Sequence, residues 1–138
     1  MSLNLTEHEI SLVRASFHKM LAQADQAAFL FYNRLFQIAP DAALLFRSNM
    51  ADQRSKFIQM LGQVVGLLSD PEELPPLLQQ LGKRHKHYHV TPEQYDTVGT
   101  ALIWTLEQTL ETGFTDEMRA AWRKTYAYMA ETAKSAAY

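Results

Sequence analysis

The sequence contains no cysteine, and this absence excludes disulfide bonds, thiol nucleophiles and thiolate-held iron–sulfur clusters or haem. It is also compatible with a reducing compartment. No apolar run approaches the roughly 20 residues that span a bilayer, and the N-terminal residues MSLNLTEHEI lack the basic and apolar regions of a secretory signal. We therefore expect a cytoplasmic protein without a membrane segment.

An excess of positive charge is missing as well, since 13 lysines and arginines face 15 acidic residues for a net charge of −2. This balance argues against nucleic-acid binding, and the one basic cluster is local, at residues 83–89. The five glycines are scattered and form no phosphate loop, and no Gly-x-Ser-x-Gly motif is present. Acidic residues concentrate at expected helix starts and solvent faces, so a hydrolase or nucleotide enzyme has little support.

Helical periodicity dominates what is present, and no segment alternates apolar and polar residues as a half-buried strand does. We expect a single all-α domain over residues 1–138, with about six main helices and a short one near residues 41–46, crossing obliquely. Thr6 with Glu9 and Thr91 with Gln94 have the spacing of capping boxes at two helix starts.

Two finer expectations concern helix faces and starts. In the second helix the apolar spacing predicts a buried stripe made by Phe29, Tyr32, Leu35 and Phe36. The pair Pro75-Pro76 predicts a delayed start for the helix that follows.

That helix carries the most informative residue, His85. Its apolar face ends on this imidazole, because the following residues share one face at helical spacing: Leu74, Leu77, Leu78, Leu81 and His85. A buried imidazole needs a hydrogen-bond partner or a metal. From this stretch alone, a core histidine bonded to a backbone carbonyl and a ligand to a cofactor metal are equally good interpretations. Outward cations at Lys83, Arg84 and Lys86 suit a flat apolar cofactor with carboxylates at its edge.

A zinc site is a weaker alternative. His85 and His89 share a helix face, but His87 points away, so at most two of the three could hold one ion there. Haem fits better, because it needs one inward imidazole, many apolar and aromatic positions on surrounding helices, and nearby cations. Gln53 ends the apolar stripe of its own helix one turn before Phe57, as His85 does on its helix.

Motifs along nearly the whole chain resemble those of one family, in the family's order. They are Phe31-Tyr32-Asn33-Arg34-Leu35-Phe36, Pro40 with Phe46, Gln53-Arg54, Lys83-Arg84-His85, Pro92-Glu93-Gln94-Tyr95 with Val98-Gly99, and Ala121-Trp122-Arg123-Lys124-Thr125-Tyr126. The chain resembles a globin, and is similar in particular to bacterial single-domain haemoglobins and the globin part of flavohaemoglobins. The resemblance implies the globin fold around a haem pocket.

The resemblance also implies a set of site residues. His85 would be the proximal ligand of the iron in haem b (iron protoporphyrin IX), Phe46 would stack on the porphyrin, and Tyr32 with Gln53 would form the distal pair. Phe57 would close the distal side with a bulkier ring than the family often has. Further contacts with the cofactor are expected from Phe31, Arg47, Leu81, Arg84, Val90, Tyr95 and Val98.

The implied function is reversible, high-affinity binding of dioxygen, with nitric oxide and carbon monoxide as further ligands, by a binding protein rather than an enzyme. A buried phenol that donates to polarised dioxygen stabilises it by about 1.5–3 kcal/mol. This corresponds to roughly ten- to hundredfold in affinity, mainly through slower release. Carbon monoxide, which is less polarised, should gain less.

Two departures from the flavohaemoglobin pattern bear on the alternative function, nitric oxide dioxygenation or peroxide reduction. Those proteins continue into a reductase, whereas this sequence ends at Tyr138, so we expect turnover to need a separate reductase. They also place a glutamate late in the last helix, where this chain has about Ala137, and Glu131 is out of phase. A haem-free interaction or sensor module is a third hypothesis. The apolar last helix is compatible with a monomer or a homodimer.

Overall fold

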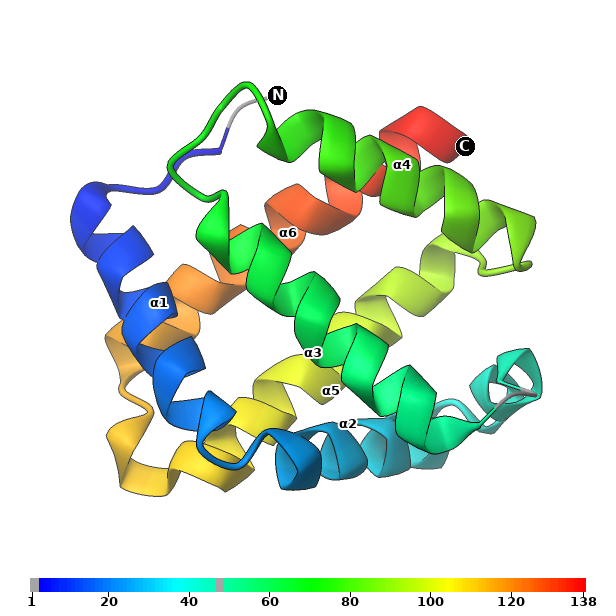
Figure 1. Cartoon of the computed structure of the whole chain (residues 1–138), viewed down its shortest axis with the longest axis horizontal. Coiled ribbons are helices and arrows are strands. Elements are labelled where there is room, and N and C mark those ends of the chain that lie inside the picture. Colours follow the sequence, from blue (N-terminus) through cyan, green and yellow to red (C-terminus); the bar gives the residue numbers. More distant parts are fainter. Residues whose placement is uncertain (1–2, 47–48) are drawn as a thin grey trace.

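The computed structural model describes residues 3–46 and 49–138, which form six α-helices, two short 3-10 segments and no strand (Figure 1). The elements are α1 (Glu7–Leu21), α2 (Ala24–Ile38), η1 (Pro40–Leu45), α3 (Met50–Gly66), α4 (Leu74–His87), α5 (Pro92–Leu110), η2 (Glu111–Gly113) and α6 (Asp116–Ala137). The predicted all-α fold is confirmed, including the short helical segment after Pro40. Among the described residues, no helix is both long and apolar enough to cross a membrane.

The predicted helix starts are confirmed as well. The Thr6 side chain accepts a hydrogen bond from the Glu9 amide at 3.1 Å, and the Glu9 carboxylate accepts from the Thr6 amide at 3.0 Å. At the start of α5, the Gln94 side chain accepts from the Thr91 amide at 2.9 Å. These contacts satisfy amides that have no partner inside the helix.

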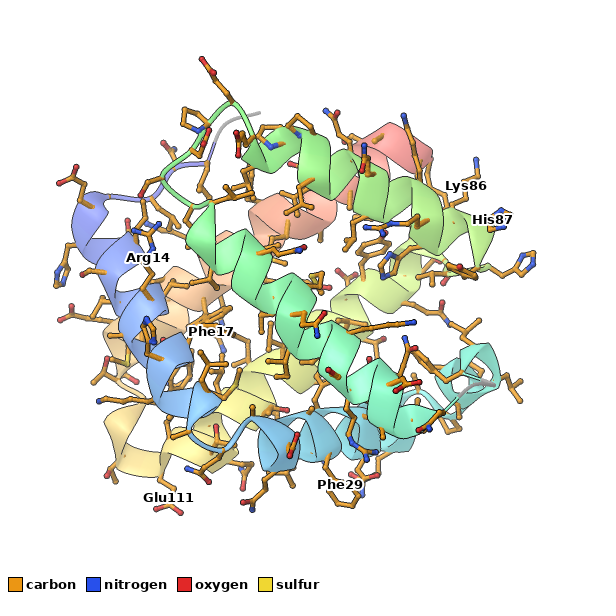
Figure 2. The ribbon with its side chains drawn as sticks, viewed as in Figure 1. Arg14, Phe17, Phe29, Lys86, His87 and Glu111 are labelled. Atoms are coloured by element: carbon orange, nitrogen blue, oxygen red, sulfur yellow. The ribbon has the colours of Figure 1, made fainter. Side chains whose placement is uncertain are left out.

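Two of the finer expectations are wrong. Phe29 is 52% exposed, whereas Phe31 is 2% exposed, because α2 turns the face of Ala28, Phe31 and Leu35 toward α5. Phe29 lies on the outer face instead, within 6.0 Å of the Arg54 guanidinium and away from the core (Figure 2). The pair Pro75-Pro76 does not delay α4 but lies in its first turn, where a helix does not need the amide that proline lacks.

The packing of the helices places the ends of α3 and α4 apart. α2 packs on α5, α4 packs on α6, and α1 contacts both α5 and α6. Figure 1 shows α2 and α4 at opposite edges of the molecule, with α3 running obliquely between them. α3 and α4 diverge from the turn at residues 67–73, so the Gln53 end of α3 and the His85 end of α4 lie on the side where the two helices are far apart.

One glycine, Gly82, determines how closely α4 packs on α6. A Cβ atom on Gly82 would lie within 3.0 Å of three backbone atoms of Ala133, with the carbonyl oxygen nearest. Only a residue without a side chain allows this approach of the two backbones. Because Gly82 precedes His85 by less than one turn, this contact also fixes where the imidazole is held.

Candidate functional site

His85 lies in the last turn of α4 with a half-buried side chain. Its Nδ1 is 2.7 Å from the Leu81 carbonyl oxygen one turn earlier. A carbonyl only accepts, so Nδ1 carries the proton and Nε2 has a lone pair that points away from the helix. Burial lowers the pKa of His85 below its usual value, which favours the neutral imidazole that binds metals. From the sequence alone, a histidine bonded to a carbonyl and a histidine that binds a metal were alternatives. The structure makes them compatible, because Nδ1 donates to the Leu81 carbonyl and Nε2 stays available for a metal.

A small apolar cluster lies beside the imidazole, which contacts its members Leu81 and Tyr95. It contains Leu81, Tyr95, Ala130 and Ala133, with Val90 packed against it. The Tyr95 ring centroid lies 6.0 Å from that of His85. This cluster brings together three residues of the predicted proximal site, namely Leu81, Val90 and Tyr95.

The Tyr95 hydroxyl is buried and has no hydrogen-bond partner among the described residues. Burial raises the pKa of Tyr95 to about 12, so the phenol stays neutral at ordinary pH. The Nδ1 proton of His85 is therefore held by a neutral carbonyl, with no carboxylate from the described residues within hydrogen-bond distance. A histidine supported in this way is less anionic than one bonded to a carboxylate.

Aromatic side chains from α2, α3 and the residue after η1 gather on the other side of the predicted site. Phe31 and Phe57 are stacked, with ring centroids 4.1 Å apart and an interplanar angle of 10°. The Tyr32 ring forms edge-to-face pairs with Phe46 and Phe57, with ring centroids 5.3 Å and 5.8 Å apart. The structure thus brings together four of the residues predicted to contact the cofactor or its ligand, namely Phe31, Tyr32, Phe46 and Phe57.

The Tyr32 hydroxyl is the polar group of this aromatic cluster. Its residue is 6% exposed, and the hydroxyl donates to the backbone carbonyl of Gln53 at 3.5 Å, which is long for an O–H···O bond. Burial raises the pKa of Tyr32 to about 12, so the phenol keeps its proton. The Gln53 side chain is half-buried beside it. Tyr32 is therefore a protonated donor with a poor acceptor in an apolar surrounding.

The other predicted residues are placed differently. Val98 is half-buried against the main core, and Arg84 is exposed on α4. Arg47 lies outside the described residues. Met60, which was not singled out, packs against both the main core and the cluster around His85. The sequence does carry a signal for Met60: it lies seven positions after Gln53, which is about two helical turns, and so shares the face of α3 that carries Gln53.

The ligand side chains available at the site, a single imidazole, fit a metal whose other ligands come from a cofactor. Among the described residues, no group of three or more histidine, cysteine, aspartate or glutamate side chains could hold a metal ion. A single neutral imidazole then serves only a metal whose remaining positions are filled by another molecule, as they are in a porphyrin. The residues around His85 and Tyr32 therefore fit haem.

Comparisons with known proteins identify the family of the chain. The Globin family profile matches residues 14–133. The chain is 33% identical over 133 residues to a flavohemoprotein of Rhizobium meliloti, which covers 92% of this chain and 32% of that protein. It is 26% identical over 136 residues to Neuroglobin-2 of Oncorhynchus mykiss, covering 88% of this chain and 86% of that protein.

The fold is also shared with a solved structure. The crystal structure of a hexacoordinated haem protein from an anhydrobiotic tardigrade superposes with a TM-score of 0.84 at 18% identity, over 97% of this chain and 96% of that one. The chain spans about a third of the length of the flavohemoprotein that it matches. The family profile covers most of the chain, and the family implies a haem cofactor. The chain belongs to the globin family.

Proposed function

We propose that this protein holds haem b through His85 and binds dioxygen reversibly on the opposite face, next to Tyr32. The observation that carries the proposal is the neutral His85 imidazole, whose Nδ1 is engaged by Leu81 and whose Nε2 is directed away from α4. Haem would supply an iron atom that an imidazole can hold and that can bind a diatomic gas. The unit proposed to do this is a single globin domain over residues 1–138.

The protein's own residues set the strength of gas binding. The Leu81 carbonyl holds the Nδ1 proton of His85 and so keeps the ring in the tautomer that presents Nε2. The Tyr32 hydroxyl would keep its proton and offer it as a hydrogen bond to a diatomic gas, and polarised dioxygen would gain more from that bond than carbon monoxide. Phe31 and Phe57 both pack against the Tyr32 ring, which is 6% exposed, and such an apolar surrounding would strengthen that hydrogen bond. Gln53 and Phe46 complete the proposed distal surface.

Replacing Tyr32 with phenylalanine is expected to speed dioxygen release at least about tenfold, because the only strong donor in the aromatic cluster is lost. Stopped-flow displacement of dioxygen measures the rate, and carbon monoxide release should change much less. The matched control is Tyr128→Phe, which removes a phenol hydroxyl from a half-buried residue of α6 that packs against the main core and is not part of the proposed haem site. An unchanged dioxygen off-rate in Tyr32→Phe would show that Gln53 or another group holds the ligand.

Nitric oxide dioxygenation is a second candidate, and the similarity to flavohemoproteins supports it. The unpaired Tyr95 hydroxyl and the neutral partner of His85 weigh toward a gas carrier, because redox enzymes of this kind profit from a more anionic histidine. An external flavin reductase would be the electron source.

A stopped-flow experiment separates the two functions. The oxygenated protein is mixed with excess nitric oxide in the presence of a flavin reductase and nicotinamide cofactor. A carrier is expected to consume about one equivalent of nitric oxide per haem and then to recover slowly. Many rapid equivalents per haem would instead establish the dioxygenase, and a preparation that takes up no haem would contradict both candidates.

A further inference from the structure

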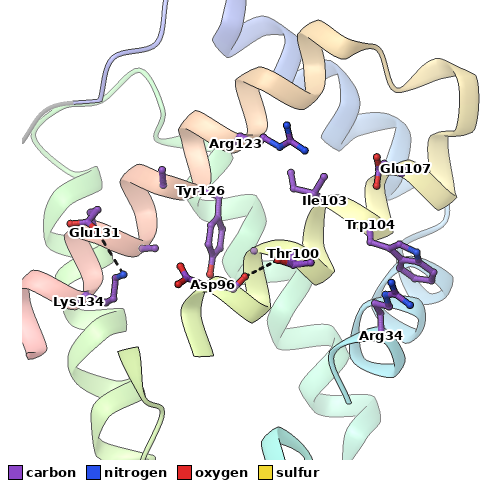
Figure 3. A pocket seen from close by; sticks show the side chains of 13 residues that line it. Arg34, Asp96, Thr100, Ile103, Trp104, Glu107, Arg123, Tyr126, Glu131 and Lys134 are labelled. Atoms are coloured by element: carbon purple, nitrogen blue, oxygen red, sulfur yellow. Dashed lines mark hydrogen bonds and ion pairs between the residues drawn. The ribbon is translucent and has the colours of Figure 1, made fainter. Parts of the chain in front are cut away.

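A groove of about 550 Å³ runs between α5 and α6 on the outside of the molecule (Figure 3). Of its lining residues, only Ala130 also belongs to the cluster beside His85. Its floor is largely apolar and aromatic, made by Ile103, Trp104, Tyr126, Ala127 and Ala130. Such a floor flanked by polar groups is typical of a binding surface.

The two helices are antiparallel along this groove. Arg119 of α6 contacts Glu107 of α5 at 3.1 Å, whereas Tyr126, two turns later in α6, faces Gly99, which lies two turns earlier in α5. One end of the groove therefore contains Asp96, and the other contains Trp104. Figure 3 shows the same order, with Glu131 and Lys134 near Asp96 and the Arg34 side chain beside Trp104.

The ends of the groove differ in uncompensated charge. Toward the Trp104 end, Arg34 and Arg123 have no carboxylate within 4.0 Å among the described residues, and Glu107 is already paired with Arg119. At the other end Glu131 is paired with Lys134 at 3.7 Å, and Asp96 has no cation partner in the described part of the chain. The groove thus has a basic end and an acidic end.

Arg34 adds a second observation that points to a missing partner. Its Nε atom is buried without a hydrogen-bond acceptor in the described structure, and its guanidinium lies 5.0 Å from the centroid of the Trp104 ring. Buried donors in folded proteins almost always have an acceptor. Because Nε itself is buried, a carboxylate from another molecule would meet the terminal nitrogens of this guanidinium, which are not among the buried atoms and which the stacking on Trp104 holds in place.

We propose that this groove is the contact face of a homodimer. Its two-fold axis lies in the plane of the interface, at right angles to the long direction of the groove. That axis reverses the groove end for end, so the basic end of each copy lies over the acidic end of the other. The lining contains three cationic and three acidic side chains, so a second copy suits it better than a purely acidic or purely basic partner. This inference goes beyond the proposed function and does not depend on haem.

The groove also indicates how strong the dimer is. The lining of α5 from Asp96 to Glu107 spans about 16 Å at 1.5 Å per residue. A face of this length and two helices wide is smaller than the roughly 800 Å² per partner of a standard stable interface. We therefore expect a dimer that forms in the micromolar range and weakens as salt screens the charged ends.

A charge-exchange experiment tests both the face and its geometry. Sedimentation velocity of the haem-loaded protein over a range of concentrations is expected to show dimerisation. Arg123→Glu and Asp96→Lys should each weaken it at least about tenfold, because each places like charges opposite one another twice. In an equimolar mixture of the two variants, every contact again joins opposite charges, so a heterodimer should form at least as readily as the wild-type dimer. Lys19→Glu on the exposed face of α1 is the control of equal charge change.

Several results would overturn the proposal. These are a wild-type protein that stays monomeric at about 100 μM, a dimer unaffected by either reversal, or single effects without recovery in the mixture. Circular dichroism verifies that both variants keep their helices, and both positions are exposed. A wild-type dimer that does not weaken between about 0.05 and 0.5 M salt would also contradict the charged contact.

Discussion

Substitution of His85 by alanine is expected to remove the imidazole proposed to hold the haem iron, and with it stable haem binding. Loss of a partner that only orients a metal ligand costs about 10–100-fold in metal affinity, so loss of the ligand itself should speed haem transfer to a competing apoprotein by at least about a hundredfold. The visible bands of any haem retained should move, because the iron has lost its nitrogen ligand. Absorption spectra and the transfer rate measure the two effects.

His87→Ala is the matched control, since His87 is exposed in the same last turn of α4, and Figure 2 shows it at the surface beside Lys86. This variant should keep the wild-type spectrum and transfer rate. Added imidazole should restore the bands of His85→Ala by occupying the vacated position. If His85→Ala stays red with unmoved bands, another group holds the haem.

Gly82→Ala is expected to lower the free energy of unfolding by about 3 kcal/mol or more. The added methyl group would overlap the Ala133 backbone, which has no rotamer to change, so α4 must move away from α6. For a domain of this size that corresponds to a decrease in Tm of roughly 10 °C. Because α4 carries His85, haem release should also become faster. Thermal unfolding followed by circular dichroism and the haem transfer rate measure these changes.

Gly66→Ala provides the control for this prediction. Gly66 is the last residue of α3, and a Cβ atom there meets nothing within 4 Å. The free energy of unfolding of the Gly66→Ala protein should therefore differ from that of the wild type by less than about 1 kcal/mol. A Gly82→Ala protein that unfolds with the wild-type midpoint would mean that the two helices are not held in backbone contact at this point.

Helix positions and the inward direction of His85 were predictable because they depend on neighbours in the chain. The capping pairs at Thr6 and Thr91 are separated by three residues, and the stripe that ends on His85 follows the helical period. The burial of Phe31 instead of Phe29 was not predictable in the same way. Both residues lie on apolar stretches of α2, and the choice between them depends on which side of α2 meets α5 and α3.

By itself, the sequence determined the all-α fold, the family motifs and the candidate residues of the proposed haem site. The tertiary structure alone decided the contact between the Gly82 and Ala133 backbones, the long bond from Tyr32 to the Gln53 carbonyl, and the charged ends of the α5–α6 groove. The physical reason is that capping and periodicity act over a few residues, whereas these contacts join distant ones: Tyr32 and Gln53 are 21 positions apart, Gly82 and Ala133 are 51, and Arg34 and Trp104 are 70. Their distances are set by how whole helices pack, and the helical period carries no record of that.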